Sequence, residues 1–255
     1  MYIITGGGSG IGRALALSLA KRGKPVLIIG RREQLLKDTA AAGGANIDYL
    51  CADVSTEAGL NQILNHLSGF EKIDALINNA GTLGTLQTLN EINMDAWMQS
   101  LNINLNAPLF LSQKFYQQLL SGSGRILNIS SGAAYFPIKG WGSYCVTKAA
   151  LSMMTKCWQF ENELVPCASV MPGIIDTPML NLARTEGPDF EKRDFYQKLK
   201  LQGRLVTPET VALFLTWLLL DIDTKTFTSQ EWDIYETWHH SSWLTAPHQV
   251  LHWDI

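Results

Sequence analysis

Residues 5–12 read Thr5-Gly6-Gly7-Gly8-Ser9-Gly10-Ile11-Gly12, a glycine-rich stretch near the start of the chain. It follows a short apolar run, Tyr2–Thr5, and opens a helical pattern that places Leu15 and Leu19 on one face. Glycines permit a tight turn and a close approach of the backbone to a pyrophosphate, while a helix N-terminus offers free N–H groups and the positive end of its dipole. A glycine-rich loop between a strand and a helix therefore predicts dinucleotide binding; the alternative is a flexible glycine loop without a ligand.

Short apolar runs alternate with helical patterns along the rest of the chain. Gly23 and Pro25 end the first helix and begin the second strand. The further runs typical of buried strands are Val26–Ile29, Ile47–Cys51, Ala75–Ile77, Arg125–Ser130 and Cys167–Met171. Repeated strand–helix units predict a parallel sheet with helices on both faces, an α/β doubly wound (Rossmann) fold. No linker, internal repeat or low-complexity segment interrupts the pattern, so we expect a single domain over residues 1–255.

Composition and charge narrow the class of protein. The chain has 255 residues, of which 46% are hydrophobic and 17% charged, and its formal net charge is −3. Without a basic excess or a basic amphipathic stretch, neither a nucleic acid nor a membrane is expected as a partner. The strand pattern begins at Tyr2, which leaves no room for a signal peptide, and the cysteines show no C-x-x-C spacing. We therefore expect reduced thiols and a cytoplasmic location.

The end of the second strand bears on the choice of cofactor. It reads Ile28-Ile29-Gly30-Arg31-Arg32. A sheet that binds NAD usually carries Asp or Glu at the place of Gly30, where the carboxylate holds the ribose 2′-hydroxyl. Arg31 offers a guanidinium instead, which suits a 2′-phosphate. We therefore predict NADP(H) as the cofactor; the alternative is that Arg31 and Arg32 are solvated residues leading into the next helix.

Tyr144 and Lys148 form a candidate reactive pair. They lie four residues apart in Tyr144-Cys145-Val146-Thr147-Lys148, so on a helix they share one face. Free tyrosine has a pKa of about 10, and a nearby ammonium lowers that pKa. By itself the spacing is also that of an ordinary surface pair. Ser130 and Ser131 support a reactive site, because strand C-terminal ends bind ligands in open α/β sheets, although either serine could be only a strand-end cap.

These motifs together resemble those of the short-chain dehydrogenase/reductase family over nearly the whole chain. Residues 5–12 match its T-G-x-x-x-G-x-G, and Asp53-Val54 match its adenine-side Asp-Val. Asn78-Asn79-Ala80-Gly81 match N-N-A-G after the fourth strand, and Pro172-Gly173-Ile174-Ile175-Asp176-Thr177 match P-G-x-x-x-T. The resemblance implies a sheet of seven strands in the order 3-2-1-4-5-6-7. It also implies cofactor contacts from Thr5, Gly6, Gly8, Ser9, Gly10, Ile11, Gly12, Arg31, Arg32, Asp53, Val54, Asn79, Ala80, Gly81, Tyr144, Lys148, Pro172, Gly173, Ile175 and Thr177.

The resemblance further implies the catalytic residues Asn104, Ser131, Tyr144 and Lys148. Ser131 lies 13 residues before Tyr144, the family spacing, which favours it over Ser130. Tyr144 would donate a proton to a carbonyl oxygen as hydride arrives at the carbon, and Lys148 would lower the pKa of Tyr144 and hold the nicotinamide ribose. Ser131 would orient the substrate oxygen, and Asn104 would hold a water in a proton relay. No metal is required.

A narrower resemblance bears on the substrate. Residues 138–145 are similar to the K-G-W-x-x-Y-C segment of sepiapterin reductases and bacterial benzil reductases, and Ile175-Asp176-Thr177 to their L/M-D-T. Residues 228–235 resemble their final strand. The similarity implies NADPH-dependent reduction of a ketone in a dicarbonyl or pteridine-like molecule. Ser131, Trp141, Tyr144 and Asp176 would contact it, with Asp176 anchoring an amino-pyrimidine. Trp141 could instead simply pack beside the helix, and Asp176 could cap the helix that begins near Thr177.

Two segments and two other functions remain open. Residues 178–203 are expected to form a substrate loop, and the Trp- and His-rich tail 237–255 to pack on its own fold or on a neighbouring subunit rather than to bind a metal. The family implies a homodimer, or a homotetramer, through the helix of Tyr144 and the preceding helix. The alternatives to a carbonyl reductase are an NAD-dependent alcohol dehydrogenase of the same family and a non-catalytic cofactor-binding sensor or scaffold.

Overall fold

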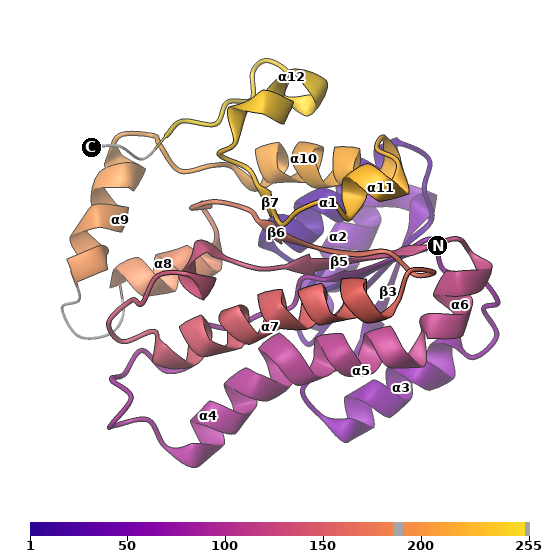
Figure 1. The fold of residues 1–255 in the computed structure, drawn as a ribbon, viewed down its shortest axis with the longest axis horizontal. Coiled ribbons are helices and arrows are strands. Elements are labelled where there is room, and N and C mark those ends of the chain that lie inside the picture. Colours follow the sequence, from indigo (N-terminus) through magenta and orange to yellow (C-terminus); the bar gives the residue numbers. More distant parts are fainter. Residues whose placement is uncertain (186–190, 253–255) are drawn as a thin grey trace.

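Seven parallel strands form one sheet in the order β3-β2-β1-β4-β5-β6-β7 in the computed structural model, which describes residues 1–185 and 191–252. Figure 1 shows this sheet between two layers of helices. The strands are β1 (Tyr2–Thr5), β2 (Val26–Gly30), β3 (Ile47–Cys51), β4 (Ala75–Asn78), β5 (Arg125–Ile129), β6 (Cys167–Met171) and β7 (Trp232–Asp233). This confirms the predicted doubly wound fold, with a single domain and the predicted strand order.

Helices connect the strands and cover both faces of the sheet. In the first half of the chain the helices are α1 (Gly10–Lys21), α2 (Glu33–Gly43), α3 (Glu57–Leu67), α4 (Met94–Leu101), α5 (Ala107–Lys114) and α6 (Tyr116–Ser121). In the second half they are α7 (Gly142–Glu161), α8 (Pro178–Thr185), α9 (Glu191–Leu201), α10 (Pro208–Leu220), α11 (Thr224–Phe227) and α12 (His240–Trp243). A π-helical turn, Asn102–Asn106, joins α4 to α5, and short 3₁₀ turns lie at Gly44–Asn46, Gly132–Ala134 and Thr237–His239.

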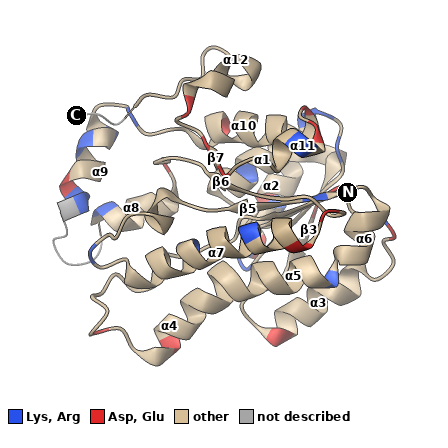
Figure 2. Cartoon of the chain, viewed as in Figure 1, with Lys and Arg blue, Asp and Glu red and all other residues tan. Residues whose placement is uncertain are grey.

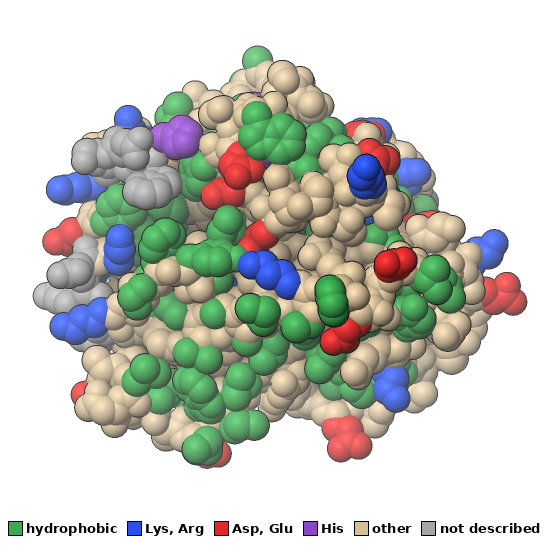
Figure 3. Space-filling view, viewed as in Figure 1, with side chains coloured by type: hydrophobic (Ala, Val, Ile, Leu, Met, Phe, Trp, Pro, Cys, Tyr) green, Lys and Arg blue, Asp and Glu red, His purple; other side chains and the backbone are tan. Residues whose placement is uncertain are grey.

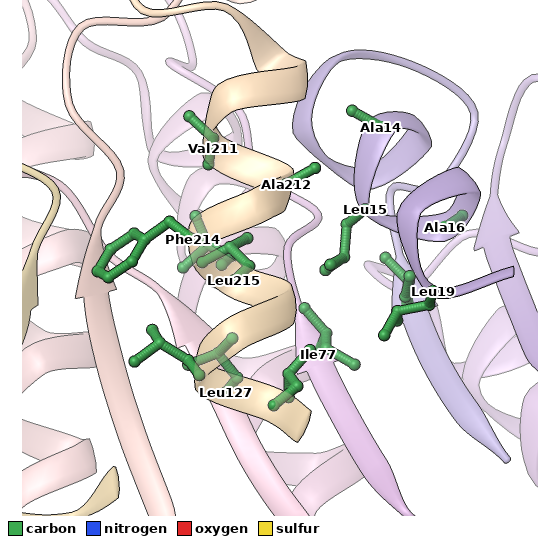
Figure 4. Packing of buried hydrophobic residues seen from close by; sticks show 14 of the residues in the cluster. Ala14, Leu15, Ala16, Leu19, Ile77, Leu127, Val211, Ala212, Phe214 and Leu215 are labelled. Atoms are coloured by element: carbon green, nitrogen blue, oxygen red, sulfur yellow. The ribbon is translucent and has the colours of Figure 1, made fainter. Parts of the chain in front are cut away.

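The core is divided between the two faces of the sheet. Helices α1 and α10 pack together on one face, where Leu15 of α1 points toward Leu215 of α10 above the strands (Figure 4). On the other face, α3 and α5 bury Ile63, Leu111 and their neighbours against β1 and β4. Both faces of the central strands are covered, so those strands consist almost wholly of apolar residues. The sheet and its buried faces thus support the loops at the carboxyl ends of the strands.

The strand boundaries agree with the sequence to within one residue for β1 to β6. Strand β7 is much shorter than the segment 228–235 that resembled a final strand, since only Trp232 and Asp233 pair with β6. After β7 the tail turns back over α10. There the His239 ring lies against the Phe214 ring, and the His248 Nδ1 is 3.0 Å from the Thr210 hydroxyl. The tail thus packs on its own fold as far as residue 252; residues 253–255 lie outside the described part.

Helices α9 and α10 differ in how many charged residues they carry. Figure 2 shows Lys, Arg, Asp and Glu along α9, whereas α10 is apolar over most of its length. Within residues 1–185 and 191–252, no helix has both the length and the apolar composition that crossing a bilayer demands. In the same residues, His, Cys, Asp and Glu side chains form no group of three or more that could hold a metal ion.

Candidate active site

The loops that follow the strands line one large cavity of about 1180 Å³. Carboxyl ends of parallel strands meet at one edge of the sheet, so segments far apart in the sequence converge there. The predicted cofactor contacts that line this cavity are Gly6, Gly8, Ser9, Gly10, Ile11, Arg31, Arg32, Asp53, Val54, Asn79, Ala80, Gly81, Tyr144, Lys148, Pro172, Gly173, Ile175 and Thr177. Ser131 and Trp141 line it as well.

The glycine loop has the backbone shape that its sequence requires. Gly6 has φ +71° and Gly10 has φ +52°, conformations that residues with a Cβ rarely adopt. A Cβ on Gly6 would lie 2.9 Å from the Asn79 Nδ2 atom, so the tight turn and the neighbouring loop fit only a glycine. Helix α1 begins at Gly10, and its N-cap residue Ser9 uses no side-chain hydrogen bond to close the helix end. The first N–H groups of α1 are therefore available to an anion.

Thr5 and Gly12, predicted as cofactor contacts, lie behind the loop and do not line the cavity. The Thr5 hydroxyl accepts hydrogen bonds from the backbone N–H groups of Asn79 and Ala80, at 3.1 and 3.0 Å. A Cβ on Gly12 would lie 2.5 Å from the Gly6 carbonyl oxygen, so glycine lets the helix pack closely under the loop. The match to the family motif was right, but these two residues shape the site rather than line it.

Two arginines stand at the end of β2. Arg31 lies 3.7 Å from the Asp53 carboxylate, and Arg32 donates a 2.7 Å hydrogen bond to the Ser9 hydroxyl. Both arginine side chains are exposed and line the cavity. Gly30 lines it too, and no carboxylate projects from that position. This corner of the cavity therefore presents two cations and one partly neutralised carboxylate.

Helix α7 and the end of β5 bring the reactive side chains together. Tyr144 and Lys148 lie on the buried face of α7, and Ser131 follows β5 and caps the turn Gly132–Ala134. The Lys148 ammonium donates a 2.7 Å hydrogen bond to the Ile129 carbonyl oxygen and lies 5.6 Å from the centre of the Tyr144 ring. Three of the four predicted catalytic residues, Ser131, Tyr144 and Lys148, thus line the cavity together.

Burial moves the pKa values of this pair in opposite directions. The pKa of Tyr144 is raised to about 12 by its burial, and a hydrogen bond with Ser131 opposes that rise. The pKa of Lys148 is lowered to about 8, also by burial. Burial disfavours the charged phenolate, which is why it raises the pKa of Tyr144. The lowering of this pKa by Lys148 stays a prediction. Tyr144 is protonated at neutral pH, the form that can donate a proton.

Asn104 lies behind the cavity, in the π-helical turn between α4 and α5. Its amide donates hydrogen bonds to the Thr82 carbonyl at 2.9 Å and to the Thr147 hydroxyl at 3.0 Å. Its side-chain oxygen accepts a 2.9 Å hydrogen bond from the Thr82 N–H. The side chain thus fixes the loop after β4 against α7. These bonds occupy its amide, and the water that the family resemblance implies stays a prediction.

Aromatic and aliphatic side chains line the cavity near Tyr144. The Trp141 ring lies edge-on to the Tyr144 ring, with centroids 5.8 Å apart, and is also 5.8 Å from the Tyr196 ring. Phe195 lies next to Tyr196 on α9. Both aromatic residues lie in the predicted substrate loop 178–203, but neither was predicted individually as a site residue. The adjacent Phe195-Tyr196 pair in a charged segment was the available signal. Residues 186–190 of that loop lie outside the described part.

Asp176 does not line the cavity, so its predicted contact with substrate is not supported by its position. Its carboxylate pairs with the Lys200 ammonium and lies 3.9 Å from the Arg184 guanidinium. The competing interpretation, an N-cap, is wrong, because the Thr177 hydroxyl accepts the hydrogen bond from the Leu180 N–H at the start of α8. Asp176 instead links the loop after β6 to α8 and α9.

Comparisons with known proteins agree with this geometry. Residues 1–187 match the family model described as short chain dehydrogenase. The chain is 33% identical over 230 residues to benzil reductase ((S)-benzoin forming) of Bacillus subtilis (strain 168), covering 86% of this chain and 93% of that protein. It is 36% identical over 236 residues to sepiapterin reductase of Meriones unguiculatus, covering 85% and 90%. A short-chain dehydrogenase/reductase structure from Saccharomyces cerevisiae aligns with TM-score 0.84 and 27% identity, covering 91% and 94%.

The chain therefore belongs to the short-chain dehydrogenase family and is an oxidoreductase of that family, whose members bind a nicotinamide cofactor. Within the family it resembles the benzil reductase and sepiapterin reductase subgroup, as the sequence segments predicted.

Proposed function

We propose that this chain is an NADPH-dependent carbonyl reductase that reduces one ketone of an apolar, aromatic dicarbonyl. The observation that carries the proposal is the set Ser131, Tyr144 and Lys148 in a cavity whose wall near Tyr144 is formed by Trp141 and Tyr196. A protonated phenol beside an aromatic wall suits the delivery of a proton to the oxygen of a flat, apolar ketone.

The cavity fits a nicotinamide dinucleotide. The positive φ of Gly6 and Gly10 and the open N-terminus of α1 make the cradle that a pyrophosphate requires. The two cations at the end of β2 suit a 2′-phosphate, and the lack of a carboxylate at Gly30 removes the usual partner of a free ribose 2′-hydroxyl. These features favour NADPH over NADH and count against an NAD-dependent alcohol dehydrogenase.

In the proposed reaction a bound nicotinamide supplies hydride to the carbonyl carbon. Tyr144 gives its phenolic proton to the carbonyl oxygen as negative charge develops there. Lys148, held by the Ile129 carbonyl, stabilises the tyrosinate that remains. The Ser131 hydroxyl, which lines the cavity together with Tyr144, orients the oxygen that receives the proton. Trp141 and Tyr196 exclude water around the ketone and hold its flat substituents.

The position of Asp176 favours one of the two substrate classes suggested by the relatives. An amino-pyrimidine needs a carboxylate facing it, and Asp176 is engaged by Lys200 and Arg184 away from the cavity. The benzil reductases to which the chain is similar act, by name, on a diketone with two aromatic substituents. An apolar diketone therefore suits this cavity better than a pteridine.

Consumption of NADPH with a panel of diketones tests the proposal. We expect turnover of benzil with NADPH, and a lower kcat/KM with NADH. Tyr144→Phe, which removes only a hydroxyl, should lose most of kcat and keep its affinity for NADPH, because the proton is needed only in the chemical step. Absence of turnover with every diketone would favour the cofactor-binding sensor, and a preference for NADH with alcohols would favour the dehydrogenase. As further proposals, the enzyme is cytoplasmic and forms a homodimer.

A further inference from the structure

Glu231 connects three elements behind the catalytic serine. It lies just before β7 and does not line the cavity. Its Oε1 atom accepts hydrogen bonds of 2.8 Å from the Ser152 hydroxyl of α7 and of 2.8 Å from the Ser169 hydroxyl of β6. Its Oε2 atom accepts a hydrogen bond from the Tyr135 hydroxyl. One carboxylate thus gathers donors from a helix, a strand and the loop between β5 and α7.

The hydroxyl protons in this network can point in only one direction. An ionised carboxylate only accepts, so Ser152 must give its single proton to Glu231. The Ser130 hydroxyl lies 2.7 Å from the Ser152 oxygen and, because Ser152 has no proton left, Ser130 is the donor in that contact. The order is therefore Ser130 to Ser152 to Glu231. Ser130, Ser152 and Ser169 are all buried, so water does not compete with these bonds.

The same network of hydrogen bonds holds both ends of the turn that follows Ser131. Ser130 precedes Ser131 and is held through Ser152, while Tyr135 ends the turn and is held directly by Glu231. Between them, the Ser131 hydroxyl accepts a 3.2 Å hydrogen bond from the Ala133 N–H. Burial, reinforced by Glu231, raises the pKa of Tyr135 to about 12, so Tyr135 remains a donor at neutral pH.

Helix α7 completes the connection to the catalytic pair. Tyr144, Lys148 and Ser152 follow one another at four-residue intervals, so they share one face of the helix. Lys148 binds the carbonyl of Ile129, and Ser152 binds the side chain of the next residue, Ser130. The end of β5 is thus fastened to α7 at two successive residues, and the second fastening depends on Glu231.

We propose that Glu231 is a positioning residue that sets the place of Ser131 and Tyr135 relative to Tyr144, through Ser152 on one side and the Tyr135 hydroxyl on the other. The catalytic consequence rests on the proposed carbonyl reduction. Small displacements of a group that orients the reacting oxygen can cost about a hundredfold in rate, so a carboxylate outside the cavity can control the chemical step.

The test compares Glu231→Gln with Glu236→Gln. Glutamine keeps the size of the side chain but has one acceptor oxygen in place of two, so it cannot accept from Ser152, Ser169 and Tyr135 as the carboxylate does. Glu236 is an exposed carboxylate of the same segment that contacts Gln230 and Trp238 and lies outside the network, which makes it the matched control. Ser152→Ala breaks only the route to Ser130.

Two measurements are made on each variant. Hydrogen exchange of the peptide that contains residues 131–135 reports the turn without any turnover. Single-turnover reduction of benzil, normalised to bound NADPH, reports the chemical step and is independent of any misfolded fraction. We expect Glu231→Gln to speed exchange in this peptide and to slow the single-turnover rate about tenfold, with the NADPH dissociation constant within about twofold of wild type. Ser152→Ala should show a smaller effect of the same kind, and Glu236→Gln none.

Unchanged exchange and an unchanged single-turnover rate in Glu231→Gln would overturn the proposal. Equal losses in Glu231→Gln and Glu236→Gln would also overturn it, because they would reflect a general effect of the C-terminal segment. If wild type reduces no ketone, the proposed function fails, and the exchange data then decide by themselves whether Glu231 positions the turn.

Discussion

At the scale of single residues, the opposite pKa shifts of Tyr144 and Lys148 suit a reductase. Burial raises the pKa of Tyr144 to about 12, so the phenol keeps the proton that it would donate at neutral pH. Burial also brings the pKa of Lys148 down to about 8, near the range in which the enzyme would work. The ammonium is therefore the group whose charge changes first as the solution becomes alkaline. The pH dependence of reduction should report Lys148 rather than Tyr144.

We expect kcat for reduction to be level below about pH 8 and to fall by about tenfold per pH unit above it, as Lys148 loses its proton. The sign follows from the reaction, because the neutral amine no longer stabilises the tyrosinate that forms when Tyr144 gives up its proton. The measurement is kcat from pH 6 to 10 at saturating NADPH and benzil. Lys148→Arg retains a positive charge at these pH values and should flatten the alkaline limb, even at a lower rate. A level wild-type profile up to pH 10 would contradict the assignment.

Cofactor choice depends on Arg31 at the cavity corner. A charge-assisted contact between its guanidinium and a 2′-phosphate is worth about 1.5–3 kcal/mol. Arg31→Asp should therefore weaken NADPH binding by about tenfold to about a hundredfold, while NADH binding changes little because a carboxylate can accept from the ribose hydroxyls. Dissociation constants for both cofactors give the ratio directly. Lys72→Asp makes the same change of charge at an exposed position outside the cavity and should leave the ratio unchanged. An unchanged ratio in Arg31→Asp would exclude the NADPH proposal.

At the scale of elements, helices α8 and α9 close one side of the cavity through contacts that are distant in sequence. Tyr196 of α9 packs on Trp141 at the start of α7. Lys200 of α9 pairs with Asp176, which lies 24 residues earlier. These contacts fix where the substrate loop lies against the catalytic helix. They also hold the Asp176 carboxylate against its ion-pair partners rather than in the wall of the cavity.

Asp176→Asn tests the role of that carboxylate. The change keeps the shape of the side chain and removes its charge, and the pair with Lys200 is partly exposed, so the loss of stability should be at most about 1 kcal/mol. We expect KM for benzil and KM for an amino-pteridine ketone to respond alike, each by less than about twofold. Asp194→Asn, on the exposed face of α9, serves as the control. A selective rise in KM for the pteridine would restore the original prediction that Asp176 anchors an amino-pyrimidine.

The sequence was most informative where local chemistry alone determines structure. Strands β1 to β6 could be predicted because they are short apolar runs bounded by turn residues. The glycine loop could be predicted because its turn requires positive φ angles, which glycine adopts readily. Ser131, Tyr144 and Lys148 could be predicted from their spacing in the sequence. Ser131 follows β5, and Tyr144 and Lys148 share one face of α7, so the fold brings the three side chains together. Side chains whose role depends on a distant partner could not be predicted. The ion pairs of Asp176, the hydrogen bonds of Asn104 to Thr82 and Thr147, and the network of Glu231 are of this kind.

At the scale of the whole molecule, one outer face is unusually apolar. On α7 the exposed residues Val146, Met153 and Phe160 recur every seven residues and so lie along one side of the helix, with Phe160 91% exposed. Exposed Met94 and Met98 extend the face onto α4, which packs against α7. Figure 3 shows hydrophobic side chains gathered on the face where α4 and α7 lie in Figure 1. The opposite side of α7 holds Tyr144, Lys148 and Ser152, so the helix that forms the site also supplies the exposed stripe.

The stripe leads to the last prediction, a homodimer formed through α7. In a two-fold dimer each residue near the axis meets its own copy, so a single substitution acts twice. Met153→Glu places two carboxylates in an apolar contact, where their desolvation and repulsion oppose association, and should convert the protein to a monomer in sedimentation equilibrium. Leu201→Glu makes the same kind of change at an exposed leucine on α9, away from this face, and should leave the assembly as in wild type. A monomeric wild type, or a Met153→Glu variant that still associates, would show that this face of α7 is not the interface.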